Sequence, residues 1–206
     1  MQQLNCCQIA LGQQMKIVVV PHLPCLNNEL GLCTGLSSQG ASEFGKSLSH
    51  YVKVPESKYG RINAILSSPL PRCIETVELC FSSYRCPVLY DVRLLALDYG
   101  DYHDKSIAYV SREQHRFLTT PYPGGESYAD MAARYASFLD EALPQFVNKT
   151  VILIGHNGTK EMLAHLCLGL SLESLFNMRK VRDRKPTRVQ IEAQFARAEY
   201  VCFEYS

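Results

Sequence analysis

The stretch KIVVVPHLPC, residues 16–25, decides the fold of this chain. It opens with the apolar, β-branched run Lys16–Val20, which predicts a strand buried on both faces of a parallel sheet. The run ends at Pro21, and His22 follows it, held between Pro21 and Pro24. Ligands of open α/β sheets bind beyond the carboxyl ends of the strands. His22 is therefore the first candidate for a functional residue.

Other segments repeat this pattern along the chain. Apolar runs predict strands at Ile62–Leu66 and Val151–Gly155, with weaker candidates at Pro87–Tyr90 and Glu199–Phe203. Apolar residues at helical spacing predict helices at Ser127–Leu143 and Lys160–Leu170. Strands that alternate with helices predict an α/β fold, a three-layer sandwich with a mostly parallel central sheet flanked by helices. We expect residues 1–14 to be an N-terminal extension and residues 15–206 to form a single domain.

Composition narrows the classes of function. The formal net charge of the 206 residues is +1, which gives no electrostatic reason to expect a nucleic-acid or anionic-membrane partner. No apolar run approaches the roughly 20 residues that a membrane-spanning helix needs. The nine cysteines include no C-x-x-C pair, so no zinc or other metal site is expected. The simplest interpretation is free thiols, most of them buried as small apolar side chains, in a reducing cytoplasm.

Polar residues follow the three best strands. Ser68 and Arg72 come after the second strand, and His156, Asn157 and Gly158 come after the third. A neutral imidazole can attack phosphorus and carry the phosphoryl group covalently. An arginine fork and a protonated histidine can bind the phosphoryl oxygens. The strand ends therefore predict an anion site with a possible nucleophile, which requires no metal.

The ordered motifs resemble those of the histidine phosphatase superfamily, the phosphoglycerate-mutase-like group. VVVPHL stands at the family's R-H-G motif, and Asn28 lies six residues past the histidine. The S-P-L-x-R-x-x-x-T motif is complete from Ser68 to Thr76. Gly124–Ser127 matches the family's G-G-E-S, and Gly155–Gly158 matches its S-H-x-G. The resemblance implies that His22 accepts the phosphoryl group, that Arg72, His156 and Asn28 hold its oxygens, and that Ser68, Asn157 and Gly158 help to bind substrate.

The chain departs from the family at two chemically important positions. Pro21 replaces the arginine of R-H-G, and Ala96 replaces the acidic residue that would donate a proton. Loss of one transition-state donor costs on the order of 10²–10³ in rate, and a missing general acid costs a comparable factor. Asp98, Asp104 and Glu126 are candidate substitute acids, of which Asp98 is the nearest. With the resemblance, the sequence thus predicts a cofactor-independent hydrolase of a small phosphomonoester that works through a phosphohistidine, with activity weakened by both losses. The alternative is a catalytically degenerate protein that binds a phosphorylated ligand or partner.

Two segments carry other interpretations. Gly40–Ser47, GASEFGKS, matches the Walker A pattern, which would make the chain a P-loop NTPase. A P-loop follows a strand directly, however, and none is predicted before Gly40. The run at residues 179–188 holds six basic residues against Asp183. Its default interpretation is a solvated face, and the alternative is an extension over the pocket that binds further phosphates.

Overall fold

The computed structural model describes residues 15–178, 186–196 and 200–205. The expected extension at residues 1–14 and most of the basic run at 179–188 lie outside the described residues. Five strands form one sheet in the order β3-β2-β4-β1-β5. Their bounds are β1 Met15–Pro21, β2 Ile62–Ser67, β3 Val88–Tyr90, β4 Thr150–Gly155 and β5 Val201–Tyr205. All five predicted strands are present, with ends that differ by one or two residues from the predicted ones.

The sheet is mostly parallel, as predicted. β4 lies between β1 and β2 and runs parallel to both, β3 is parallel to β2, and only β5 is antiparallel, on the outer edge of β1. Pro21 at the end of β1 pairs with Gly155 at the end of β4, and Ser67 at the end of β2 pairs with Ile154. The three strand ends therefore reach the same edge of the sheet.

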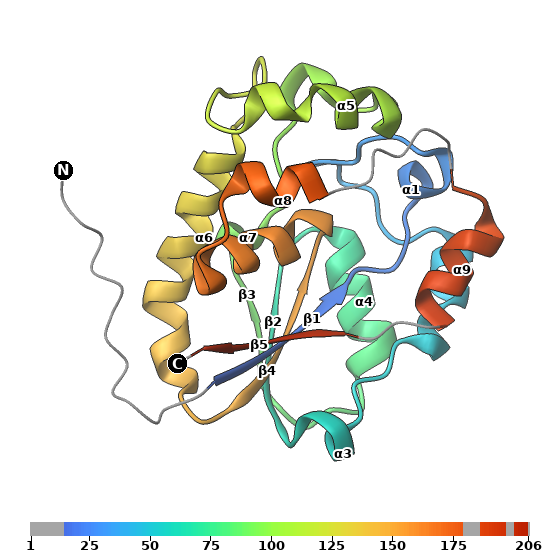
Figure 1. Ribbon diagram of the computed structural model, residues 1–206. Coiled ribbons are helices and arrows are strands. Elements are labelled where there is room, and N and C mark those ends of the chain that lie inside the picture. The colour runs from blue at the N-terminus through green and yellow to red at the C-terminus, as the bar shows by residue number, and fades with distance from the viewer. Residues whose placement is uncertain (1–14, 179–185, 197–199, 206) are drawn as a thin grey trace, which may run out of the picture.

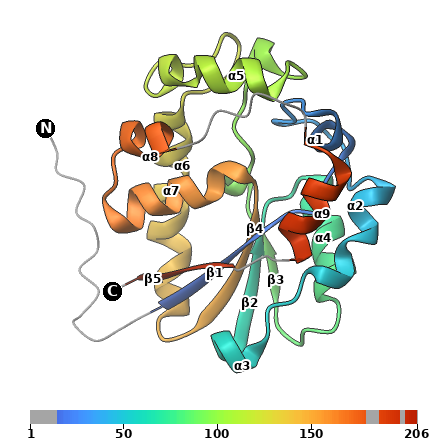
Figure 2. The same ribbon diagram turned by 45° about the vertical axis from the view of Figure 1, so that its right-hand side comes forward.

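Helices cover both faces and complete the three layers (Figure 1). The longer helices are α4 Pro71–Phe81, α6 Tyr128–Ala142, α7 Asn157–Leu168 and α9 Arg188–Ala196. The shorter ones are α1 Leu26–Leu30, α2 Glu43–Ser47, α3 Glu56–Tyr59, α5 Ile107–Glu113 and α8 Leu172–Met178, with 3-10 turns at Ser49–Tyr51, Val92–Leu94, Gly100–Tyr102, Gln114–Phe117 and Leu143–Phe146. Figure 2 shows α6 and α7 on one side of the sheet and α4, α2 and α9 on the other.

Alternating residues of the central strands divide the core into two halves. Val19, Leu66 and Leu153 face the α6 and α7 layer, whereas Val18, Ile65 and Ile152 face the α4 layer. All six side chains are almost fully buried. Burial of apolar area on both faces stabilises the sheet by about 25 cal/mol per Å². This rigid centre fixes the positions of the residues that leave the strand ends.

Both predicted helices form. The first occupies Tyr128–Ala142 rather than Ser127–Leu143, because the Ser127 hydroxyl accepts a hydrogen bond from the Asp130 amide and so caps the helix. The second begins at Asn157, three residues before the predicted start. There the Thr159 hydroxyl accepts a hydrogen bond from the His156 amide at 2.9 Å and completes a capping box. Gly169, with φ +67°, ends this helix.

The P-loop interpretation is wrong. In the described residues no strand leads directly into Gly40: β1 ends at Pro21, and α1 and turns lie between the two. The Walker lysine, Lys46, pairs with Glu43 on the same short helix, with Nζ and Oε1 3.1 Å apart. The cysteine interpretation holds only in part. The seven described cysteines are free thiols, but only Cys25, Cys33 and Cys73 are buried.

Candidate active site

A cavity of about 940 Å³ opens at the carboxyl edge of the sheet. Of the residues predicted for the site, it is lined by His22, Asn28, Arg72, His156, Asn157 and Gly158. Pro21 and Ala96, the two positions that depart from the family motifs, line the same cavity. The structure thus brings most of the predicted residues to one place.

His22 is oriented by its own backbone. Its amide donates to the Gly155 carbonyl at 3.1 Å, which continues the pairing of β1 with β4 for one more residue. Its ring Nδ1 lies 2.7 Å from the Leu23 carbonyl oxygen. A carbonyl oxygen only accepts hydrogen bonds, so Nδ1 carries the proton and Nε2 keeps its lone pair. Burial, and secondly the charge of Arg72, lower the pKa of His22 to about 3. His22 is therefore a neutral, oriented imidazole whose Nε2 lone pair is the candidate nucleophile.

His156 faces His22 across the cavity, with ring centroids 5.2 Å apart. Arg72 Nη2 lies 3.4 Å from His156 Nδ1 and donates to it, because a guanidinium has no lone pair to accept with. Nε2 then carries the proton and donates to Ser68 Oγ at 3.0 Å. Burial first, then the neighbouring His22 and Arg72, lower the pKa of His156 well below its ordinary value. In the empty site His156 is neutral, and an entering phosphate dianion would favour its protonation.

Arg72 is 1% exposed and is held by a loop from a distant part of the chain. Nη1 donates to the Ser37 carbonyl at 2.9 Å, and Nη2 donates to the Gly35 carbonyl at 2.7 Å. Nε is buried and has no hydrogen-bond partner within the described part of the chain. Both terminal nitrogens of the guanidinium therefore donate hydrogen bonds within the protein, whereas the N–H group at Nε is buried without a partner among the described residues. Its net charge remains at the site, although fewer of its N–H groups are available to an anion.

The remaining predicted residues are placed differently. Asn28 Oδ1 accepts from the Cys25 amide at 3.0 Å and so caps α1, while the residue also lines the cavity. Ser68 contacts His156 and is not among the residues that line the cavity. Asp98 also does not line the cavity. Its Oδ1 accepts from the Gly100 amide at 2.9 Å and lies 3.0 Å from His103 Nε2.

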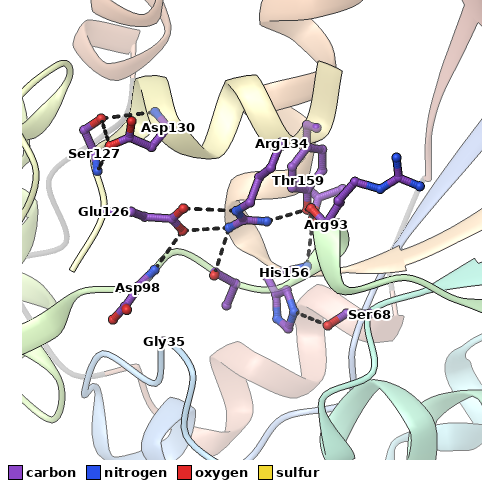
Figure 3. A network of polar contacts seen from close by, with 12 residues as sticks. Gly35, Ser68, Arg93, Asp98, Glu126, Ser127, Asp130, Arg134, His156 and Thr159 are labelled. Carbon is purple, nitrogen blue, oxygen red and sulfur yellow. Dashed lines mark hydrogen bonds and ion pairs between the residues drawn. The ribbon is translucent and has the colours of Figure 1, made fainter. Parts of the chain in front are cut away.

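Figure 3 shows the polar network that surrounds the backbone next to the cavity, around Arg134 and Glu126. Arg134 forms a two-point ion pair with Glu126, with Nη2 2.7 Å from Oε1 and Nε 3.0 Å from Oε2. Arg134 also donates to the backbone carbonyls of Arg93 and Ala96, and Glu126 accepts from the Asp98 amide at 3.0 Å. This network fixes the backbone that carries Ala96. Sequence analysis missed Arg134; the only available signal was Glu126 within the G-G-E-S motif.

Comparison with known proteins agrees with this geometry. The family model of the histidine phosphatase superfamily (branch 1) matches residues 53–200, well over half of the chain. This chain belongs to the histidine phosphatase superfamily. The matched range contains Arg72 and His156 but begins after His22. The altered P-H-L segment of the chain therefore lies outside the match, which is consistent with its departure from R-H-G.

Individual relatives include phosphatases and mutases. The chain is 27% identical to phosphoserine phosphatase 1 of Hydrogenobacter thermophilus over 79% of this chain and 81% of that protein. It is 30% identical to a probable phosphoglycerate mutase of Proteus mirabilis over 55% of this chain and 56% of that protein. A bifunctional protein of Mycobacterium tuberculosis is 25% identical, and the match spans 48% of its length.

Solved structures support the fold. An α-ribazole phosphatase from Shigella flexneri superposes with a TM-score of 0.63 at 18% identity, covering 80% of this chain and 85% of that one. A mycobacterial glucosyl-3-phosphoglycerate phosphatase superposes with a TM-score of 0.64 at 21% identity, covering 81% and 85% of the two chains. No helix in the described residues is long and apolar enough to cross a membrane. The same residues contain no cluster of three or more His, Cys, Asp or Glu that could hold a metal ion.

Proposed function

We propose that this chain hydrolyses a phosphomonoester through a phosphohistidine formed on His22. One observation carries the proposal: the bond between Nδ1 of His22 and the Leu23 carbonyl leaves the Nε2 lone pair open, opposite His156, in a cavity large enough for a substrate. The phosphatases and mutases among its relatives support the reaction class.

The reaction has two steps. Nε2 of His22 attacks phosphorus, the bond from phosphorus to the ester oxygen breaks, and the leaving group departs with the electron pair. Arg72, His156 and Asn28 stabilise the three equatorial oxygens. Water then attacks the phosphohistidine, the phosphorus–nitrogen bond breaks, and inorganic phosphate leaves with His22 restored. Protein groups and water supply every step, and the substrate is a small phosphorylated molecule.

A second candidate is a binding protein that retains the phosphatase fold without turnover. The hydrogen bonds from Arg72 to two carbonyls favour it, because they withdraw N–H groups from the anion site. Pro21 and Ala96 favour it too, since both replace catalytic residue types of the family. The two histidines at one sheet edge favour turnover, because a scaffold has no need for both.

Steady-state hydrolysis of p-nitrophenyl phosphate in the presence of a chelator distinguishes the two candidates. This leaving group departs without a general acid, so the assay reports on the nucleophile and the anion site alone. We expect slow turnover by the wild-type chain and none above background by His22→Ala. Equal rates in the two proteins, together with saturable binding of inorganic phosphate, would establish the binding protein instead.

A further inference from the structure

One wall of the cavity belongs to α5 and the turn that follows it. Ile107, Val110, Ser111 and Gln114 line the cavity, and their spacing of three, four and seven residues places them on one face of a helix. The segment that carries α5 is tied to the loop after His22. The Ile107 amide donates to the Gly31 carbonyl at 2.8 Å, and the Cys33 amide donates to the Lys105 carbonyl at 2.9 Å. A complete helix face is therefore held against the catalytic edge.

This face is neutral. Ile107 and Val110 are apolar, and Ser111 and Gln114 carry hydrogen-bonding groups without charge. Among the described residues that line the cavity, only Arg72 and Lys160 are permanent cations and only Glu161 is a carboxylate. Arg72 lies on α4 beside the histidines, and Lys160 and Glu161 lie on α7. The α5 wall thus offers no countercharge to a carboxylate.

Gln114 provides a second, independent observation. Its side chain is 7% exposed and lines the cavity. Within the described residues no protein group forms a hydrogen bond with its amide, and the amide atoms are not fully buried, so they remain accessible at the cavity. A ligand that binds there must replace the water on these atoms with a hydrogen bond of its own. Because an amide donates and accepts, it pairs equally well with a hydroxyl or another amide.

We infer that the α5 wall is the subsite for the leaving group, and that it selects phosphomonoesters whose leaving group has an apolar body and an uncharged hydrogen-bonding end. This inference deepens the proposed function and rests on it. A leaving group that carries a carboxylate is disfavoured, because it would be buried against Val110 and Gln114, and the described residues place no cation on this wall. A neutral group of the same shape keeps the hydrogen bond to Gln114 without this penalty.

The matched pair 4-carbamoylphenyl phosphate and 4-carboxyphenyl phosphate tests the inference, because the two esters differ only in an amide and a carboxylate of the same shape. We expect wild-type kcat/KM to favour the carbamoyl ester at least about tenfold, which corresponds to the 1.4 kcal/mol of one good hydrogen bond or more. Gln114→Leu should lower kcat/KM for the carbamoyl ester about tenfold. Gln114→Lys should reverse the preference. Thr119→Lys adds the same charge at an exposed position nearby and should leave the ratio unchanged.

Binding measurements separate this inference from the proposed function. Calorimetric titration of His22→Ala with each ester gives the affinity ratio without turnover, so the subsite is tested even if the wild-type chain hydrolyses neither ester. Equal affinities, or no binding of either ester, would overturn the inference. So would a preference for the carboxyl ester that disappears in Lys160→Gln, which would assign the leaving group to the α7 wall. Thermal melting of each Gln114 variant verifies that it is folded.

Discussion

The proton on His22 links one side chain to the stability of the whole chain. The pKa of His22 in the folded chain is about 3, against an ordinary value of 6.5, mainly because the ring is buried. Between these two values the unfolded chain binds a proton that the folded chain does not. The free energy of unfolding therefore falls as the pH is lowered through this window.

This pH dependence can be measured by urea unfolding at pH 7 and pH 5. We expect His22 to contribute up to about 1 kcal/mol per pH unit to the decrease. His22→Gln should lose less stability than the wild-type chain over the same interval, because glutamine does not titrate. The exposed His115→Gln is the matched control and should behave as the wild type does. Parallel pH profiles for the wild-type chain and His22→Gln would show that His22 titrates normally in solution.

Ala96 is a single position at which a substitution should increase the catalytic activity. The side chain is 4% exposed and lines the cavity, and the family has its acidic residue at this position. Ala96→Glu should raise kcat/KM for an alkyl phosphate such as glycerol phosphate by about 10² or more, because a general acid assists a poor leaving group. Hydrolysis of p-nitrophenyl phosphate should change little. Ala96→Gln has the same size without the acid, so an equal gain in that variant would argue against proton donation.

Among the elements of the structure, the loop at Gly35 and Ser37 is held to α4 by Arg72, so this side chain should also stabilise the fold. Arg72 joins α4 to the backbone of Gly35 and Ser37 through two charged hydrogen bonds. Arg72→Met should lower the free energy of unfolding by about 3 kcal/mol, because two buried carbonyls lose their donors. Urea denaturation measures the change, and the exposed Arg61→Met serves as the control. An unchanged free energy of unfolding would mean that the loop does not hold Arg72 in solution.

The elements themselves were largely predictable from the sequence. The central strands are short apolar runs rich in β-branched residues, interrupted in β2 by Asn63, and α6 and α7 carry apolar residues at helical spacing, so local pattern was sufficient. The start of α7 was misplaced because His156 and Thr159 form a capping box that departs from the usual Ser/Thr and Glu/Gln pair. The membership of His22, Arg72 and His156 in one site followed from parallel strand ends that meet at one edge.

What could not be predicted depends on contacts between distant segments. The carbonyls of Gly35 and Ser37 lie 35 or more positions from Arg72 in the sequence, and a backbone acceptor leaves no trace in residue type. Arg134 likewise reaches Ala96 from 38 positions away. The face of α5 that lines the cavity is half polar, with Ser111 and Gln114 beside Ile107 and Val110, so its periodicity gives no clear signal.

The whole molecule places His22, the proposed nucleophile, in a cavity where Ala96 stands in place of the acidic residue of the family motif. Of the predicted acid candidates, Asp98 binds the Gly100 amide and His103 away from the cavity. The rate of phosphoryl transfer should therefore depend steeply on the leaving group. Across aryl and alkyl phosphates of similar size, we expect kcat/KM to fall by about 10²–10⁴ for leaving groups that need protonation. A flat series in steady-state assays would show that another group donates the proton.

The proposed hydrolysis depends most directly on the covalent step at His22. Because Ala96 stands where the family motif has its acid–base residue, hydrolysis of the phosphohistidine should be slower than its formation from p-nitrophenyl phosphate. Rapid mixing should give a burst of p-nitrophenol stoichiometric with the chain. Quenching in alkali, which preserves phosphohistidine, followed by peptide mass spectrometry should locate the phosphoryl group on His22. Linear product release with His22 unmodified, or the label on any other residue, would contradict the account.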